Sequence, residues 1–173
     1  GVSADRADYR QVVLRGRLLA ALARINPHIP PLALEEAADA VTRVSDPLLV
    51  VRNRAVHRLL LGGVEVAFPK PDGESKTIDL ACFIDFTNPS NNEFLVVNQF
   101  TVQGNKQPLR PDLVAFINGL PVLTFELKNS LTKQTVADAI TQYQTDRNPG
   151  ELLFQMGRCV AHMAVDDAEV RFC

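Results

Sequence analysis

A β-hairpin signal in the middle of the chain constrains the fold more than any other feature. Two apolar runs flank the dipeptide Asn118-Gly119, which favours a tight turn between antiparallel strands. Three ionisable residues, Asp112, Glu126 and Lys128, lie at the ends of these runs that are distant from the turn. Because a hairpin doubles the chain back on itself, we expect two carboxylates and an amine to converge at its open end.

The register of this hairpin decides whether the two carboxylates share a face. Glu126 and Lys128 are two positions apart, so they point to the same side of a strand. A regular two-residue loop would pair position 112 with 125 and place Asp112 on the opposite side. A three-residue loop over 118–120, or a β-bulge between the turn and Glu126, would instead pair position 112 with 126. We therefore predict one of these irregularities, and Pro121 is its natural place because proline cannot donate to the ladder.

Two carboxylates held this close repel each other unless a proton or a cation lies between them. Carboxylate oxygens favour a hard divalent ion, most simply Mg²⁺, and we expect Asp112 and Glu126 to hold it. Lys128 would neutralise developing negative charge and orient a water molecule. These groups together suit the hydrolysis of a phosphodiester bond. The alternative interpretation is an ordinary ion pair between Glu126 and Lys128 at the end of a strand.

The residues around the hairpin resemble a known family. Pro111-Asp112, followed after 13 residues by Glu126-Leu127-Lys128, is similar to the PD-(D/E)xK nuclease motif. The wider sequence resembles the amino-terminal nuclease domain of the restriction (R) subunit of type I restriction-modification enzymes. The segments that carry this resemblance are 98–102, 110–113, 118–121, 126–129 and 138–147, with a weaker likeness at 24–27.

The resemblance implies a restriction-endonuclease-like α/β (α+β) fold, in which helices flank a mixed β-sheet. It implies one nuclease domain over 1–173, with a helical segment over 1–63 and a sheet core over 64–173. Asp112, Glu126 and Lys128 would be catalytic, and the backbone carbonyl of Leu127 would join the two acids as a ligand of Mg²⁺, for which Mn²⁺ would substitute. The alternatives are a non-catalytic DNA-binding or subunit-docking domain and a nuclease of the DNA repair type.

The same resemblance implies partners outside this chain. Double-stranded DNA would be the substrate, and the methylation (M) and specificity (S) subunits would select it. Type I R subunits carry an ATP-driven translocase after the nuclease domain, but this chain lacks a G-x-x-x-x-G-K-[ST] phosphate loop. We therefore expect a fragment of a longer subunit, in which ATP is used only by the missing region.

Further residues are candidates for contact with DNA or with the active site. Nucleases of this kind often carry a glutamine and, four positions later, an aromatic residue on the helix after the lysine. Gln142 matches the glutamine, but Asp146 stands where the aromatic residue is expected, and Tyr143 lies on the apolar stripe of the helix. The alternative interpretation of Gln142 is a simple polar helix residue. Arg147 lies in a segment that resembles the family, but the resemblance assigns it no role in the mechanism.

Two further candidate contact residues lie before the hairpin, and the sequence leaves open which acidic residue would be an additional metal ligand. Gln99 and Arg110 are candidate contacts to DNA or to the active site, although a buried strand glutamine is an equal alternative for Gln99. These nucleases often recruit another acidic residue from upstream, for which Glu35, Glu36 and Glu65 are the candidates, and nothing in the sequence selects one of them.

Composition limits how DNA can be bound. The chain has a net charge of −2 with 46% apolar and 22% charged residues, which is ordinary for a globular protein and provides no global basic field. Between Gln103 and Lys133, however, cationic side chains exceed acidic ones by two, the cations being Lys106, Arg110, Lys128 and Lys133. We therefore expect DNA contact to be focused at the hairpin.

Cysteine and histidine spacings do not indicate a metal centre. Cys82, Cys159 and Cys173 are widely spaced, which is typical of unpaired thiols in a reduced cytosol. The histidines are isolated, so core or surface roles are expected for His28, His57 and His162. No apolar stretch is long enough to span a membrane and no signal pattern is present, which favours a cytoplasmic protein without membrane contact.

Apolar periodicity predicts helices in the first third of the chain and mainly strands after it. The expected helices are 5–25, one that opens at Pro30-Pro31, one that begins at Ser45-Asp46-Pro47 and ends at Gly62-Gly63, and a later one over 132–146. The expected strands are 64–68, 77–86, 93–102, the two strands of the hairpin, 159–165 and 170–172.

Overall fold

A computed structural model describes residues 5–44, 46–70, 73, 75–104, 108–129, 131 and 133–172. Lys106, the predicted helix start at residue 132 and the thiol of Cys173 lie outside the described residues. The described residues contain helices and a mixed β-sheet, which confirms the predicted fold class.

The helices are α1 (Arg15–Ile25), α2 (Pro31–Thr42), α3 (Leu49–Gly62), the short 3₁₀ helix η1 (Pro89–Asn91) and α4 (Val136–Thr145). The strands are β1 (Val64–Pro69), β2 (Lys76–Ala81), β3 (Phe94–Asn98), β4 (Val102–Gln103), β5 (Pro108–Leu109), β6 (Leu113–Ile117), β7 (Leu120–Leu127), β8 (Ala161–Val165) and β9 (Val170–Phe172). Within the described residues, the main sheet has five strands in the order β3-β6-β7-β8-β9. Its β7–β8 pair is parallel and its other pairs are antiparallel.

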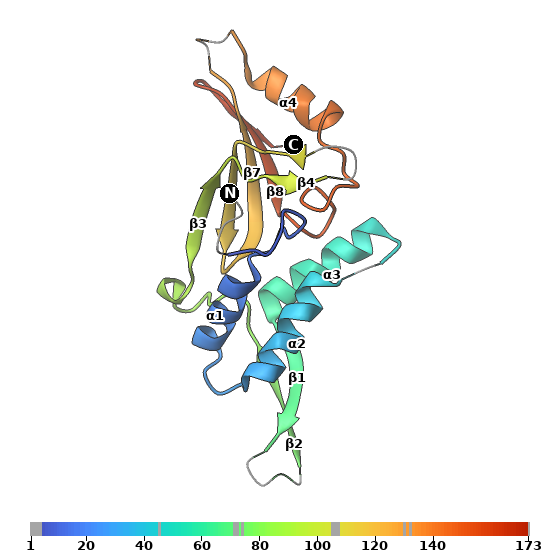
Figure 1. Ribbon diagram of the computed structural model, residues 1–173, viewed down its shortest axis with the longest axis vertical. Coiled ribbons are helices and arrows are strands. Elements are labelled where there is room, and N and C mark those ends of the chain that lie inside the picture. Colours follow the sequence, from blue (N-terminus) through green and yellow to red (C-terminus); the bar gives the residue numbers. More distant parts are fainter. Residues whose placement is uncertain are drawn as a thin grey trace.

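The molecule is elongated, and its two ends differ in architecture (Figure 1). Helices α1 and α2 and the β1–β2 ribbon gather at one end, whereas α4 lies at the other end beside β8 and β9. The turn between β6 and β7 faces the end with α1, and the open end of this hairpin faces the end with α4. The open end is where the charged residues of the hairpin meet.

The first helix is shorter than the sequence predicts. Apolar spacing predicts a helix over 5–25, but α1 begins at Arg15. The residues before it are held in turns by tertiary contacts, because the Leu14 N–H donates to the Gly119 carbonyl at 2.9 Å and the Arg6 guanidinium lies 4.0 Å from the centre of the Phe100 ring. These contacts compete with helical hydrogen bonds, which local periodicity does not register.

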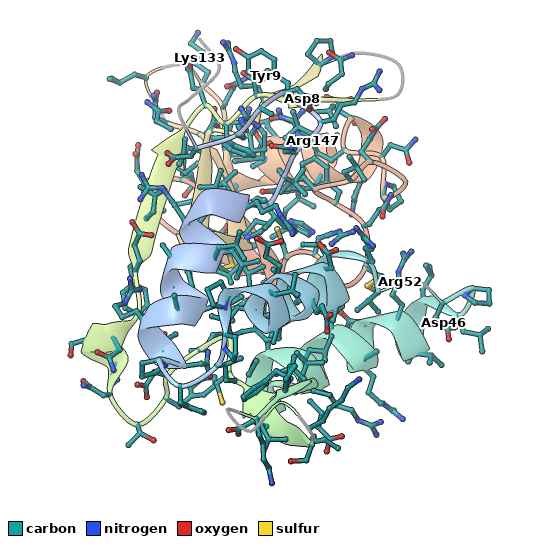
Figure 2. The ribbon with its side chains drawn as sticks, turned by 60° about the horizontal axis from the view of Figure 1, so that its bottom comes forward. Asp8, Tyr9, Asp46, Arg52, Lys133 and Arg147 are labelled. Carbon is teal, nitrogen blue, oxygen red and sulfur yellow. The ribbon has the colours of Figure 1, made fainter. Side chains whose placement is uncertain are left out.

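The next two helices lie close to their predicted positions. Helix α2 begins at Pro31 and buries the predicted apolar face, although Val44 falls beyond its end. Helix α3 begins at Leu49, two residues after Pro47, because the Asp46 carboxylate (Figure 2) accepts from the Leu48 N–H in a turn before the helix. It ends at Gly62, as predicted.

Two predicted strands are interrupted or shortened. The strand expected over 77–86 ends at Ala81. The strand expected over 93–102 breaks after Asn98, because Gln99 adopts a positive φ of 50° and its N–H donates to the Asp112 carbonyl at 2.7 Å. This turn separates β3 from β4 and places the chain beside the start of β6.

Helix α4 begins later than predicted, at Val136, and packs on β7 and β8. Thr135 and Asp138 form a capping box at its start, and the Val136 N–H donates to the Asp166 carboxylate at 2.7 Å. Its buried residues include Val136, Ala139 and Tyr143, as the apolar stripe predicts. In the described part of the chain, no helix has the length and apolar character that crossing a membrane requires.

Candidate active site

The β6–β7 hairpin contains a two-residue turn and a β-bulge. Ile117 pairs with Leu120 across Asn118-Gly119, so the alternative of a three-residue loop is wrong. Phe116 then pairs with Pro121 and Ala115 with Leu123, which leaves Val122 as the extra residue of a bulge. The predicted bulge is therefore confirmed directly after Pro121, and the register that follows sets position 112 opposite position 126.

The turn is specified by more than its backbone. Asn118 and Gly119 have φ of 52° and 79°, the left-handed conformation that this turn type requires. A Cβ on Gly119 would lie 2.5 Å from the Leu14 carbonyl oxygen, so α1 can approach the turn only because this residue is glycine. The buried Asn118 side chain accepts from the Glu93 N–H and donates to the Phe83 carbonyl, each at 2.8 Å. These contacts tie the turn to the helical end of the molecule.

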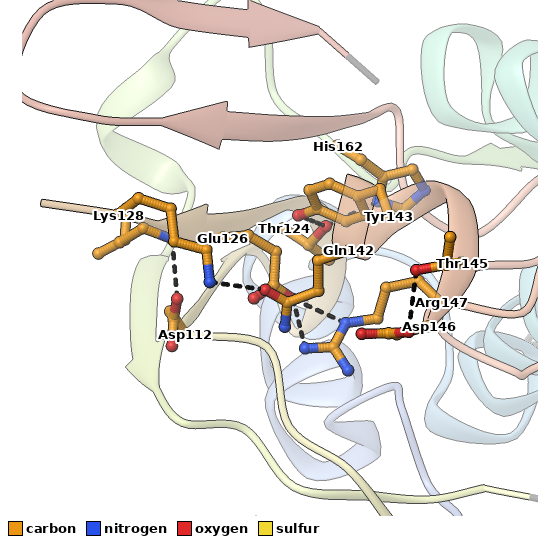
Figure 3. A network of polar contacts seen from close by, with 11 residues as sticks. Asp112, Thr124, Glu126, Lys128, Gln142, Tyr143, Thr145, Asp146, Arg147 and His162 are labelled. Carbon is orange, nitrogen blue, oxygen red and sulfur yellow. Dashed lines mark hydrogen bonds and ion pairs between the residues drawn. The ribbon is translucent and has the colours of Figure 1, made fainter. Parts of the chain in front are cut away.

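Figure 3 shows the open end of the hairpin. Oδ2 of Asp112 accepts from the Leu127 N–H at 2.8 Å, which holds the start of β6 against the end of β7. The Lys128 N–H donates to the Val165 carbonyl at 2.8 Å, and its Nζ donates to Oε1 of Gln142 at 2.8 Å. The Leu127 side chain is exposed. The site thus combines residues from β7, the start of β6 and α4.

Glu126 is the most deeply buried acid of the site, with a relative exposure of 1%. Nε and Nη2 of Arg147 contact its Oε1 at 2.7 and 2.6 Å. Burial raises the pKa of Glu126 above its usual value, and the Arg147 guanidinium opposes that rise. Asp112 raises this pKa further and Lys128 lowers it. Both of the other predicted catalytic residues therefore act electrostatically on Glu126.

Sequence reasoning assigned no role to Arg147, although the segment that contains it carries part of the resemblance. The residue lies two positions after Thr145, the last residue of α4. No spacing rule links a basic residue after a helix to a carboxylate on a strand 21 positions earlier. The only sign in the sequence that pointed to Arg147 was the resemblance of segment 138–147 to the family.

The Gln142 side chain faces the site, whereas that of Asp146 does not join it. Oε1 of Gln142 accepts from Nζ of Lys128, which brings this side chain beside the predicted catalytic lysine. The exposed Asp146 carboxylate accepts from the hydroxyl of Thr145 at 2.9 Å. Tyr143 is buried, and its hydroxyl lies 2.8 Å from that of Thr124. Among the expected helix residues, the glutamine therefore contacts the site and the residue in the aromatic position does not.

The remaining candidates lie farther from the two acids. Gln99 is exposed in a turn, which excludes the interpretation of a buried strand glutamine, and it contacts Asp112 through its backbone N–H. Arg110 is exposed two positions before Asp112. The acidic candidates Glu35, Glu36 and Glu65 are exposed on α2 and β1, at the end of the molecule away from α4 (Figure 1).

The donor set fits a hard divalent cation. Within the described residues, no group of three or more His, Cys, Asp or Glu side chains is arranged to hold a metal ion, so a site here would depend on Asp112 and Glu126. Mg²⁺ is commonly held by one or two carboxylates together with water and substrate phosphate oxygens. Two carboxylates from adjacent strands meet that requirement.

Comparison with known proteins identifies the family. The family model described as type I restriction enzyme R protein N terminus (HSDR_N) matches residues 1–173. The chain belongs to this family. Its membership in HSDR_N confirms the resemblance drawn from the hairpin and its flanking segments.

Two relatives of the HSDR_N chain cover most of its length. One, from Methanocaldococcus jannaschii, is named "Putative type I restriction enzyme MjaIXP endonuclease subunit" and is 36% identical over 154 residues, which are 87% of this chain and 15% of the relative. The other is the type I restriction enzyme HindI endonuclease subunit of Haemophilus influenzae, which is 35% identical over 151 residues, covering 86% of this chain and 14% of the relative. The chain thus spans about one seventh of the length of these relatives.

Proposed function

We propose that this chain is the DNA-cleaving domain of a type I restriction enzyme R subunit and that it hydrolyses phosphodiester bonds with Mg²⁺. The hairpin register carries the proposal, because it sets Asp112 opposite Glu126 and keeps Lys128 on the same face of the strand as Glu126. The names of the two relatives, both endonuclease subunits, support the same reaction. Mn²⁺ would substitute for Mg²⁺, because both ions accept carboxylate and water oxygens.

In this proposal Asp112 and Glu126 hold the cation, with the backbone carbonyl of Leu127 as a further ligand. A divalent ion bound there would lower the pKa of a coordinated water and polarise the phosphate. Lys128 orients the attacking water or stabilises the negative charge that develops on the phosphate. Gln142 accepts a hydrogen bond from the Lys128 ammonium and so limits where it can point.

The substrate in this proposal is double-stranded DNA, with the exposed side chains of Gln99 and Arg110 as candidate contacts to its backbone. The methylation and specificity subunits choose the DNA, and this domain cuts without reading sequence. ATP is hydrolysed only by the translocase region of the full-length subunit.

A second candidate function is a non-catalytic DNA-binding or subunit-docking domain that keeps the nuclease fold. Two observations favour it: Asp146 occupies the position where an aromatic residue is expected, and Arg147 already neutralises Glu126. The family match argues against a nuclease of the DNA repair type.

Calorimetric titration with Mn²⁺ separates the two candidate functions. The wild-type chain is expected to take up Mn²⁺, and Asp112→Asn and Glu126→Gln are expected to abolish this uptake. Asp146→Asn is the matched control, because it removes an exposed carboxylate at the end of α4 and should leave Mn²⁺ binding unchanged. Equal uptake by the wild type and Asp112→Asn would contradict the proposed metal site.

Cleavage is tested in the enzyme assembled from the complete R subunit with its methylation and specificity subunits. Asp112→Ala, Glu126→Ala and Lys128→Ala are each expected to abolish DNA cleavage while the domain remains folded by circular dichroism. Cleavage retained by all three variants would favour the docking domain.

A further inference from the structure

Arg147 is bound to the buried carboxylate of the candidate site. Its Nε and Nη2 both contact the same atom of Glu126, Oε1, at 2.7 and 2.6 Å. The side chain of Arg147 is 10% exposed and that of Glu126 is 1% exposed. Charge-assisted hydrogen bonds of this length are stronger than those between neutral groups, and exclusion of water strengthens them further.

The two acids share one feature: the protein binds a single oxygen of each carboxylate. Asp112 is held through Oδ2, which accepts from the Leu127 N–H, and Glu126 is held through Oε1. In the described part of the chain, no hydrogen bond ends on Oδ1 of Asp112 or on Oε2 of Glu126. Each carboxylate therefore has one oxygen anchored by the protein and one oxygen available to a cation.

Helix α4 and the chain that leaves its end supply the two supporting side chains. Gln142 accepts from Nζ of Lys128, and Arg147, just beyond the end of the helix, binds Glu126. The two residues are also joined through the backbone, because the Arg147 N–H donates to the Gln142 carbonyl at 3.2 Å. The docking of α4 on β7 thus sets the orientation of an acid and of the amine together (Figure 3).

We propose that Arg147 is a positioning residue that anchors Oε1 of Glu126 so that Oε2 is presented to the cation shared with Asp112. This inference rests on the proposed function. Arg147 has two opposing effects on cation binding, since its positive charge repels a cation and its hydrogen bonds orient the ligand. We expect the orienting effect to exceed the repulsion, because two donors of Arg147 fix Oε1 of Glu126 at hydrogen-bond length in a buried place. Partners that orient metal ligands typically contribute 10–100-fold in metal affinity.

The test measures Mn²⁺ affinity of the wild type, Arg147→Gln and Arg147→Lys by calorimetry. Arg147→Gln is expected to weaken Mn²⁺ binding by roughly 10-fold or more. Arg147→Lys is expected to fall between this variant and the wild type, because an ammonium keeps the charge but not the planar pair of N–H donors. Affinity in Arg147→Gln equal to or tighter than in the wild type would overturn the proposal and identify Arg147 as a competitor of the cation.

Arg171→Gln is the matched control. Arg171 and Glu126 both pair with Ala164, so they lie in the same row of the sheet, two strands apart. Arg171 is exposed and forms an ion pair with Glu169 rather than with a site acid. Its substitution removes one positive charge from the same region and should leave Mn²⁺ affinity unchanged.

A double-mutant comparison separates positioning from a general structural role. If Arg147 acts through Glu126, Arg147→Gln has little further effect on Mn²⁺ affinity in a Glu126→Asp background, which keeps a carboxylate but is one methylene shorter and so weakens its contact with Arg147. A further loss in that background would overturn the proposal. Thermal unfolding without metal checks that each variant is folded, and Arg147→Lys replaces Arg147→Gln if the latter is not.

The two proposals fail in distinguishable ways. Absence of Mn²⁺ binding in the wild type would overturn the metal-dependent function and the positioning role together. Normal binding in the wild type with unchanged binding in Arg147→Gln would overturn the positioning role alone.

Discussion

The hydroxyl of Thr124 lies 2.7 Å from Nδ1 of His162 and thereby joins neighbouring strands β7 and β8 through their side chains. The same hydroxyl lies 2.8 Å from that of Tyr143 on α4. Burial lowers the pKa of His162, so its ring is neutral near pH 7 and Nδ1 can accept from Thr124, which in turn accepts from Tyr143. This chain of hydrogen bonds fixes α4 on the sheet two positions from Glu126.

Stability is expected to fall on acidification because of His162. Its folded-state pKa is lowered, so below the usual histidine value of about 6.5 the unfolded chain binds a proton that the folded protein does not. The free energy of unfolding should therefore decrease as pH falls from about 6.5. Urea unfolding of wild type and His162→Gln between pH 5 and 8 measures this, and His162→Gln should flatten the dependence. An identical slope in both proteins would contradict the role of His162, and His57→Gln, at an exposed position on α3, is the control.

Thr124→Val should destabilise the fold by about 1–3 kcal/mol, because it removes two hydrogen bonds at once, those of the Thr124 hydroxyl with Tyr143 and with His162. The two side chains have nearly the same shape, so the change removes polarity rather than volume. Urea unfolding at pH 7 measures the effect. Thr141→Val, at an exposed position on α4, is expected to change stability by less than about 0.5 kcal/mol.

Gly119→Ala should destabilise by more than about 2 kcal/mol, because the residue has a positive φ and its new Cβ would meet backbone atoms of Leu14 and Leu18. These atoms belong to the start of α1 and cannot yield like the end of a flexible side chain. Gly16→Ala is the control, since nothing lies within 4 Å of the added carbon and the position is helical. Its stability should be unchanged or higher. Equal effects of the two substitutions in thermal unfolding would contradict the close packing of α1 on the turn.

The Cys159 thiol should be unreactive in the folded protein. It packs against the core, and burial raises its pKa to about 12, so the reactive thiolate is scarce at pH 8. Alkylation by iodoacetamide, followed at this residue by mass spectrometry, should be slow in buffer and fast in urea. Equal rates under both conditions would mean that this part of the core is open to solvent.

Lys128→Met should separate catalysis from metal binding. Because the ammonium contacts Gln142 rather than a carboxylate, its loss should leave Mn²⁺ affinity largely intact. Cleavage by the assembled enzyme should be lost as in Lys128→Ala, a fall of at least about 10²–10³-fold, the usual effect of losing one group that stabilises a transition state. Lys76→Met, at an exposed position on β2 away from the hairpin's open end, is the control and should cleave normally. A large loss of Mn²⁺ affinity in Lys128→Met would contradict the division of roles between the lysine and the acids.

Side chains alternate between the two faces of a strand, and this alternation (parity) along the hairpin was enough to predict the β-bulge that the structure contains. Requiring Asp112 and Glu126 to share a face excluded a regular two-residue hairpin. The bulge could be placed at Pro121 because proline cannot donate to the ladder. What parity could not decide was the choice between a longer loop and a bulge. In the structure the backbone at the start of α1 lies directly against Gly119, a contact between distant segments that parity does not register.

Predictions from periodicity failed where a distant segment supplied the hydrogen bonds. The helix expected from residue 5 begins only at Arg15, because Leu14 bonds to Gly119. The strand expected to run through Gln99 turns there, because its N–H bonds to the carbonyl of Asp112. In each case a residue far along the chain replaces a local partner, and a window of neighbouring residues does not contain that information.

The sequence by itself determined the hairpin, its acids and amine and the family, because turn chemistry, strand parity and motif spacing are properties of residues near one another in the chain. Only the tertiary structure decided which groups support them. Gln142 holds Lys128, Arg147 holds Glu126, and Thr124 binds Tyr143 and His162. These contacts exist because α4 docks on β7 and β8, and that docking depends on burial of its apolar face against strands that are distant in sequence.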